Sequence, residues 1–247
     1  MTLETHPVEA VRQWLADAYH ITVLTGAGIS AESGVPTFRD AQTGYWAQFR
    51  AEDMATEEGF RAHPARVWGW YQHRRQMLAD VQPNAGHRAL AEFALRHPGR
   101  LTLVTQNVDG LHQRAGSAEV LCLHGDLMED RFLDLPRACC HPDTVEAGNP
   151  PHCPRCGNLL RPGVVWFGEP LPLAVFDAAQ QAARACDLML VVGTAGAVYP
   201  AAGLAHSARA AGAKVVVVNT APSELDDVAH AVLRGSAAQV LPALLAP

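Results

Sequence analysis

Short apolar runs alternate with amphipathic stretches along most of the chain. Several of the apolar runs lack the polar–apolar alternation of a half-buried strand, as strands covered on both faces do. The strand-like runs span residues 21–28, 101–109, 119–125, 188–196 and 214–221. The helix-like stretches between or before them span residues 6–18, 87–97, 172–186 and 201–212. This alternation predicts an α/β fold with a doubly wound, mostly parallel, Rossmann-like sheet.

Two stretches interrupt the alternation. Residues 37–82 have a helical pattern without a strong strand, and residues 126–165 are rich in Pro, Cys and Gly. We expect the two to form one smaller domain, made of a helical insertion and a zinc-ribbon-like insertion. The larger domain, with the sheet, then comprises residues 1–36, 83–125 and 166–247.

Composition narrows the classes of function. The 247 residues are 49% hydrophobic, enough for a core, and their formal net charge is −6. An acidic balance argues against broad nucleic-acid binding, which needs a positive face. No run reaches the ~20 apolar residues of a membrane span, and the first residues do not read as a secretory leader. We therefore expect a cytoplasmic protein whose partners are neither nucleic acid nor membrane.

A glycine-rich turn follows the first strand-like run. Gly26, Gly28 and Ala31 fit the relaxed pattern G-x-G-x-x-G/A. In that pattern the first glycine permits a tight turn, the second lets the backbone approach a pyrophosphate, and the third residue keeps the following helix near the sheet. The alternative is a tight strand-to-helix turn with no ligand. Gly34 and Pro36 end such a helix early, which is unlike an ordinary dehydrogenase.

Polar side chains follow two further strand-like runs. Gln106, Asn107 and Asp109 come at the end of one, and His124 at the end of the next. Such amides and carboxylates either cap a turn or bind a ligand. An imidazole that titrates near neutrality in a cleft suits a general base, although an isolated histidine is more often structural.

Several long motifs identify a family. GAGISAESGVPTFRD, TQNVDGLH, LHGDL, VVWFGE, VVGTAG, VYPAAG and VVVVN occur in this order. The chain resembles the sirtuins, the NAD-dependent protein lysine deacylases, over roughly residues 16–245, and its acyl-site motif is similar to that of the bacterial-like, desuccinylase-type (class III) members. The resemblance makes the larger domain NAD-binding and the acylated lysines of proteins its partners.

The resemblance also implies the cofactor site. Phe38 and Arg39 lie in a loop that closes over the nicotinamide ribose, and Ala195 stands where the family usually has serine. Asn107 and Asp109 belong to the nicotinamide pocket. The full set of NAD contacts carried over by motif is Gly26, Ala27, Gly28, Ile29, Phe38, Arg39, Gln106, Asn107, Asp109, Gly193, Thr194, Ala195, Asn219 and Ala237.

The implied reaction uses His124 as its general base, with Asn107 as a second catalytic residue. The acyl-lysine carbonyl oxygen attacks C1′ of the nicotinamide ribose as nicotinamide leaves. His124 then removes a proton from a ribose hydroxyl, which attacks the acyl carbon. Water completes the reaction, which gives free lysine and O-acyl-ADP-ribose.

Two motifs describe the substrate. In VVWFGE, Val164, Phe167 and Gly168 match the segment along which sirtuins lay the peptide as an added strand. Tyr71 and Arg74, three apart, share one face of a helix; alone they read as an amphipathic tyrosine and a solvated arginine. By resemblance they bind the carboxylate of a succinyl or malonyl group, for which a guanidinium and a phenol are suited. Ala55 leaves room for that longer group, so we predict desuccinylation and demalonylation with deacetylation retained.

The pattern of cysteines does not decide whether the protein binds zinc. Cys153 and Cys156 form a CxxC knuckle, half of a zinc ribbon. Phe132 and Leu135 stand near the positions expected for the second pair, and adjacent cysteines 139 and 140 appear later. Vicinal cysteines rarely both bind one tetrahedral ion, so we expect at most one of them, with His141 or His152, to complete a site.

Other functions remain on the same scaffold. An NAD glycohydrolase or ADP-ribosyltransferase would use the same pocket without an acyl-lysine, and a non-catalytic NAD-sensing module would bind without turnover. The motifs favour the deacylase, and we expect it to be a monomer.

Overall fold

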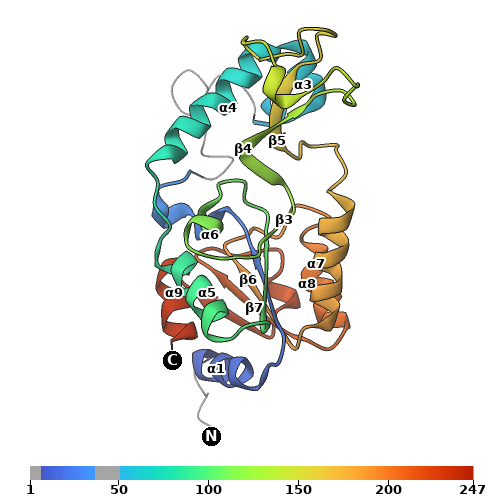
Figure 1. The fold of residues 1–247 in the computed structure, drawn as a ribbon. Helices are drawn as coiled ribbons and strands as arrows, with labels where there is room; N and C mark the ends of the chain where they lie inside the picture. The colour runs from blue at the N-terminus through green and yellow to red at the C-terminus, as the bar shows by residue number, and fades with distance from the viewer. Residues whose placement is uncertain (1–6, 37–50, 247) are drawn as a thin grey trace, which may run out of the picture.

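The computed structural model describes residues 7–36 and 51–246, which form a sheet-containing body with a smaller body at one end of the sheet (Figure 1). Six parallel strands make the sheet, in the order β3-β2-β1-β6-β7-β8. Their bounds are β1 Ile21–Thr25, β2 Leu101–Thr105, β3 Leu121–Cys122, β6 Leu188–Val192, β7 Lys214–Asn219 and β8 Ala231–Arg234. The predicted α/β fold is confirmed, and β8 is a strand that the sequence pattern missed.

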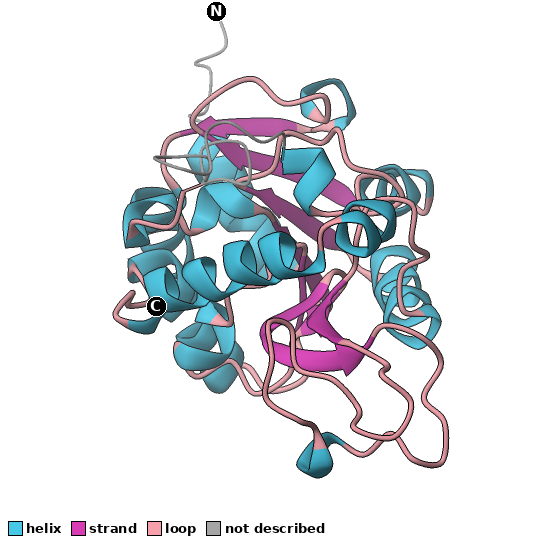
Figure 2. Ribbon diagram, turned by 90° about the horizontal axis from the view of Figure 1, so that it is seen from above, coloured by secondary structure: helices cyan, strands magenta, loops and turns pink. Residues whose placement is uncertain are grey.

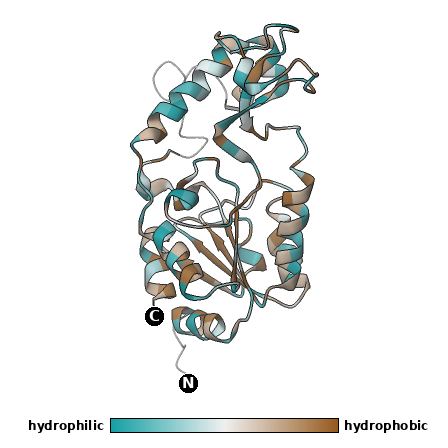
Figure 3. Ribbon diagram, in the orientation of Figure 1, coloured by the Kyte–Doolittle hydropathy of each residue, from teal (hydrophilic) through white to brown (hydrophobic). Residues whose placement is uncertain are grey.

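Helices cover both faces of this sheet (Figure 2). Helices α1, α5 and α9 pack on one face, and α7 and α8 on the other. Their bounds are α1 Pro7–Asp17, α5 Ala85–Arg96, α7 Leu173–Ala185, α8 Gly203–Ala210 and α9 Ala237–Leu245. Successive residues of a strand alternate between the two cores: in β1, Val23 faces the first and Leu24 the second. Two apolar faces explain why most positions of the central strands are hydrophobic (Figure 3).

The smaller body is built from both insertions. It contains the helices α2 Ala51–Met54, α3 Glu57–Ala62 and α4 Pro64–Ala79 and the antiparallel pair β4 Gly125–Phe132 and β5 Leu160–Val164. A third hydrophobic core, rich in tryptophan, holds these elements together. The predicted boundary after residue 125 falls at the start of β4, and the division into two domains stays a prediction. The remaining short elements are α6 Leu111–Arg114 and the 3₁₀ turns η1 Ala27–Ile29, η2 Ala31–Ser33, η4 Pro142–Thr144 and η5 Asp226–Val228.

The strand order fixes where a ligand can bind. The chain runs from β1 outward to β2 and β3, and then returns to β6 on the other side of β1. At such a switch point the loops after neighbouring strands diverge and leave a crevice at the carboxyl ends. The smaller body stands over this edge of the sheet (Figure 1). Among the described residues no helix is both long and apolar enough to traverse a bilayer.

Candidate active site

The loops after β1 and β6 meet backbone to backbone in this crevice. The N–H group of Gly28 donates to the carbonyl oxygen of Gly193, at 2.7 Å, and Gly26 N–H donates to Val192 at 2.9 Å. A Cβ atom on Gly28 would lie 2.7 Å from the Cα atom of Gly193, and one on Gly26 would lie 2.8 Å from the carbonyl oxygen of Gly193. The contact therefore requires glycine, and it leaves a cradle of bare backbone. Such a cradle fits a pyrophosphate, which needs close approach of N–H groups.

The helix expected after these glycines is absent from the described residues. Two 3₁₀ turns, η1 and η2, stand in its place, and Gly34 ends the second with a φ of 85°. The packing role predicted for Ala31 is wrong, because Ala31 is exposed. Ile29 is fully buried and anchors the turn in the core, while Ala27 is half-buried. Phe38 and Arg39 lie outside the described residues.

A serine joins the two polar residues that follow β2. The Ser30 hydroxyl donates to Oδ2 of Asp109 at 2.7 Å, and Nδ2 of Asn107 donates to Oγ of Ser30 at 3.2 Å. Asp109 is buried, and its Oδ1 atom accepts from the N–H group of Leu111 at 3.0 Å, which caps the turn that leads into α6. The capping interpretation thus holds for one carboxylate oxygen, while the other joins the Ser30–Asn107 group. The sequence analysis missed Ser30, whose only signal is a hydroxyl next to an apolar turn.

Two buried histidines lie behind this group. His112 Nε2 is 2.9 Å from Oγ1 of Thr25, which in turn donates to Oγ1 of Thr105 at 2.8 Å. His87 Nε2 is 3.4 Å from Oγ of Ser30, and the two imidazole rings lie 4.8 Å apart. Burial lowers the pKa of His87 to about 4 and that of His112 to about 3, so both are neutral at physiological pH. This polar layer was also missed, and it ties the ends of β1 and β2 together.

His124 lies where the chain passes from β3 to β4. Its Nδ1 atom is 2.8 Å from the backbone carbonyl oxygen of Gln106. A carbonyl oxygen only accepts, so Nδ1 carries the proton and Nε2 of the neutral ring is the acceptor. Burial lowers the pKa of His124 below its ordinary 6.5, although the hydrogen bond to Gln106 opposes that shift. The ring is therefore neutral near pH 7, with one fixed tautomer.

The remaining cofactor candidates line the ends of β6 and β7. Gln106 Nε2 donates to Oγ1 of Thr194 at 3.3 Å, and Asn219 Nδ2 donates to the carbonyl oxygen of Thr194 at 3.2 Å. Ala195 is exposed, and Ala237 is buried at the start of α9. The structure brings these residues to the same edge of the sheet as Gly26 and His124.

The VVWFGE segment runs between His124 and the helical insertion. Val164 pairs with Gly125, and the N–H group of the next residue, Val165, donates to the carbonyl oxygen of His124 at 2.8 Å. Two residues on, the N–H group of Phe167 donates to the carbonyl oxygen of Ala55 at 2.9 Å. Phe167 and Gly168 are exposed, and Gly168 has a φ of 86°. The backbone of the segment is thus fixed at both ends.

Tyr71 and Arg74 lie on α4, beside that segment. Tyr71 is only 2% exposed, and its hydroxyl oxygen accepts from Nε1 of Trp166 at 2.9 Å. Arg74 is half-buried, with its guanidinium 4.9 Å above the ring of Trp70. Burial raises the pKa of Tyr71 to about 12, and the charge of Arg74 partly opposes that rise. The pair therefore offers a neutral phenol beside a cation.

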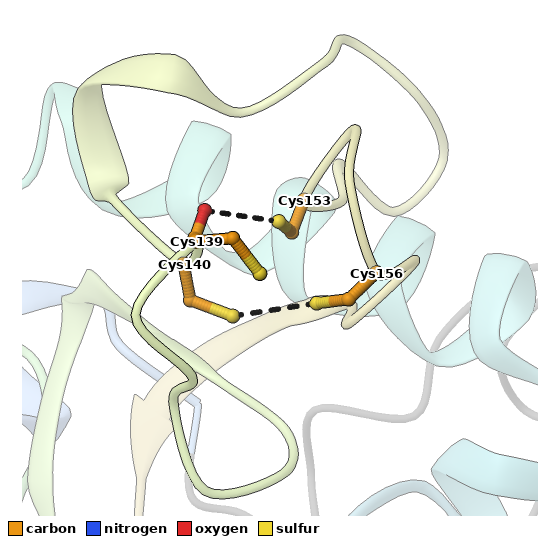
Figure 4. A group of neighbouring side chains, drawn as sticks. All are labelled: Cys139, Cys140, Cys153 and Cys156. Carbon is orange, nitrogen blue, oxygen red and sulfur yellow. Dashed lines mark hydrogen bonds between the residues drawn. The ribbon is translucent and has the colours of Figure 1, made fainter.

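Four cysteines gather in the smaller body (Figure 4). The sulfur atoms of Cys139, Cys140, Cys153 and Cys156 all lie within 4.8 Å of one another. Sulfurs that bind one zinc ion at about 2.3 Å lie roughly 3.8 Å apart, so the cluster fits a tetrahedral zinc site. A bend in the chain turns the sulfurs of both vicinal cysteines toward the cluster, which differs from the expectation that at most one of them could take part.

The histidines proposed as substitutes lie elsewhere in contact with carboxylates. His141 Nδ1 is 3.5 Å from Oδ2 of Asp143, and His152 Nε2 is 3.6 Å from Oε2 of Glu146. Neither belongs to the cysteine cluster. The second cysteine pair of a zinc ribbon was expected near Phe132 and Leu135. Cys139 and Cys140, which come later in the chain, take the place of that pair in the cluster.

Comparisons with known proteins agree with this geometry. The sequence model of the Sir2 family matches residues 26–200. The chain belongs to the Sir2 family. The resemblance to the sirtuins is therefore confirmed, and the matched range extends from the first glycine of the β1 turn to the loop before α8.

Curated members of the Sir2 family are similar over nearly the whole chain. An "NAD-dependent protein deacylase" of Ralstonia nicotianae is 55% identical over 97% of this chain and 96% of its own length. Another, of Methylococcus capsulatus, is 52% identical over 94% and 93%. These are bacterial proteins, as the sequence motifs predicted.

Solved structures of the Sir2 family share the fold. A Sir2 homolog–NAD complex is 39% identical, with a TM-score of 0.87 over 99% of this chain and 95% of that one. A Sir2 protein bound to an acetylated peptide is 28% identical, with a TM-score of 0.83 over 96% and 97%.

Proposed function

We propose that this Sir2-family NAD-dependent protein deacylase removes succinyl and malonyl groups, as well as acetyl groups, from protein lysines in the cytoplasm. The observation that carries the acyl preference is the burial of Tyr71 beside Arg74, next to the segment that would hold the peptide. A neutral phenol and a guanidinium both donate hydrogen bonds, and a carboxylate accepts them. Ala55, whose carbonyl oxygen accepts from the N–H group of Phe167, has a small side chain, which suits a longer acyl group.

NAD fits the crevice formed by the bare backbone of Gly26 and Gly28 and the polar side chains at the ends of β2 and β7. When bound, it supplies the ribose carbon to which the acyl group passes as nicotinamide leaves. Asn107 offers amide groups that suit a carboxamide, and Ser30 and Asp109 hold Asn107 in place. The side chains of Gln106 and Asn219 both bond to Thr194 and so keep the ribose side of the crevice in one shape.

His124 is the proposed general base. Its Nε2 atom is the acceptor because Gln106 holds the proton on Nδ1, and its low pKa keeps that atom unprotonated at neutral pH. The N–H group of Val165 bonds to the backbone of His124, so residues 164–169, the proposed docking segment for the peptide, run next to the residue that carries this imidazole. An acyl-lysine laid along the segment would therefore enter the crevice at the base.

The cysteine cluster is proposed to bind zinc for stability rather than for chemistry. A closed set of four thiolates leaves no open coordination position for a substrate. The cluster joins the loop after β4 to the knuckle before β5, so a metal there would fix the smaller body.

The deciding experiment compares acyl groups on one peptide. Wild type, Arg74→Met and the surface control Arg61→Met are assayed by mass spectrometry on acetyl-, succinyl- and malonyl-lysine peptides, with and without NAD. Arg74→Met should lower desuccinylation about a hundredfold or more, because charged hydrogen bonds contribute about 1.5–3 kcal/mol each, while deacetylation is largely kept. Equal loss on both substrates would overturn the acyl assignment. Nicotinamide release without any acyl peptide would instead identify a glycohydrolase.

A further inference from the structure

One buried hydrogen bond joins the acyl-site helix to the docking segment. The Nε1 atom of Trp166 lies 2.9 Å from the hydroxyl oxygen of Tyr71, and each side chain is 2% exposed. An indole N–H group can only donate, so the phenol oxygen must be the acceptor. The phenol can still donate one hydrogen bond through its own O–H group. Because Trp166 offers no acceptor there, that O–H group is directed away from Trp166.

We propose that Trp166 is a specificity-determining residue, whose indole N–H holds the Tyr71 hydroxyl as a donor toward the carboxylate of the acyl group. The inference rests on the proposed desuccinylase activity and deepens it. Without the indole donor the phenol could turn its own proton toward another acceptor. It would then present lone pairs to an anionic acyl group, which repel it.

Trp166 is itself held in one orientation. The guanidinium of Arg161 lies 3.2 Å from the centre of the indole ring, and the ring of Phe60 lies 5.2 Å away. Arg161 forms an ion pair with Glu169, and Oε2 of Glu169 also accepts from the backbone N–H group of Trp166 at 2.7 Å. Rotation of the indole would break its contacts with Arg161 and Phe60, so these contacts favour one direction of its N–H bond.

The protonation state of Tyr71 suits a donor. Burial raises its pKa to about 12, so the O–H group is kept throughout the neutral range. Accepting a hydrogen bond also polarises an O–H group and strengthens its own donation. An acetyl group has no carboxylate to receive that bond. Loss of the indole N–H should therefore act on the ratio of two activities rather than on turnover in general.

The first test removes the N–H group together with the five-membered ring of the indole, and its control removes the same atoms elsewhere in the core. Trp166→Phe keeps an aromatic ring, and Trp68→Phe is the matched control on the same helix as Tyr71 and in the same core. For Trp166→Phe, the ratio of kcat/KM for succinyl-lysine to that for acetyl-lysine should fall about two- to tenfold, as expected for one hydrogen bond. The loss should appear as a higher KM for the succinyl peptide. Trp68→Phe should leave the ratio as in wild type. An unchanged ratio in Trp166→Phe would overturn the proposal.

A double-mutant cycle tests whether Trp166 acts through Tyr71. In a Tyr71→Phe background, Trp166→Phe should no longer change the ratio, because the hydroxyl it orients is gone. The same fall in both backgrounds would contradict the proposal. Arg74→Met separates this outcome from failure of the proposed function: if Arg74→Met is selective and Trp166→Phe is neutral, the acyl assignment stands and only the role of Trp166 is lost.

Discussion

The imidazole of His124 and the backbone carbonyl of Gln106 are joined by a hydrogen bond of 2.8 Å, which leaves Nε2 as the basic atom. His124→Ala should therefore lower kcat by about 10²- to 10⁴-fold, the usual contribution of a general base. NAD affinity should be retained, because the carbonyl of Gln106 and the glycine turn remain. Steady-state kinetics and calorimetric titration with NAD measure the two effects, and a variant that keeps its kcat would refute the assignment.

The pH dependence of turnover follows from the same residue. Burial disfavours the imidazolium form and so lowers the pKa of His124 below 6.5. The base form is then populated above that pKa, and activity is lost as the pH falls through it. The acidic limb of the kcat profile should have its midpoint below 6.5. A midpoint above that value would mean that another group controls the limb.

Gly28→Ala should damage both folding and cofactor binding. The added Cβ would lie 2.7 Å from the Cα atom of Gly193, where neither backbone can yield cheaply. We expect the free energy of unfolding to fall by about 1–3 kcal/mol, as for overpacking elsewhere, with weaker NAD binding. The control is Gly203→Ala, whose Cβ would meet its nearest atoms, in the ring of Tyr199, at 3.9 Å. Denaturant unfolding of both variants makes the comparison, and equal stability would disprove the close contact.

The buried and exposed arginines that share Glu169 should differ in their effect on stability. Arg161 is 2% exposed and Arg131 is 46% exposed, while Glu169 is 16% exposed. Arg161→Met leaves the partly buried carboxylate of Glu169 without its buried partner and should cost up to about 3–5 kcal/mol. Arg131→Met removes a surface partner and should cost less than about 1 kcal/mol. Thermal and urea unfolding test the order, which would be contradicted if the two losses were the same.

Metal analysis decides how the cysteine cluster is used. We expect one zinc ion per chain in purified protein, and loss of that zinc in both Cys139→Ser and Cys140→Ser, with a lower Tm. Cys122→Ser, outside the cluster, is the control and should keep the metal. Full zinc occupancy in either of the first two variants would show that the vicinal cysteines do not both bind it.

The sequence predicted correctly those strands and helices whose buried positions repeat in a simple pattern along the chain. Strands with two apolar faces were visible because their buried positions form unbroken hydrophobic runs, all of β6 and the four valines of β7. The short strand β8 was not, because four residues carry too little pattern to distinguish them from a loop. After Gly28 the sequence predicted a helix that Gly34 ends early; Gly34 does end the segment, at a positive φ, but the residues before it form two 3₁₀ turns in place of an α-helix.

The residues of the candidate site also differ in how far the sequence could predict them. Asn107 and His124 could be predicted as site residues because they follow recognisable strands and match motifs of the family. Ser30, His87 and His112 could not, because their hydrogen bonds depend on how three separate segments meet. The cysteine cluster shows the same limit. Spacing along the chain does not reveal that a bend can turn two adjacent thiols toward one point.

The segment from Val165 to Phe167 is bonded to the sheet body through His124 and to the helical insertion through Ala55. These two backbone bonds hold in place the strand that an acylated peptide would join under the proposed function. Loss of either contact, even without any change in the residues that touch the peptide, should therefore weaken peptide binding.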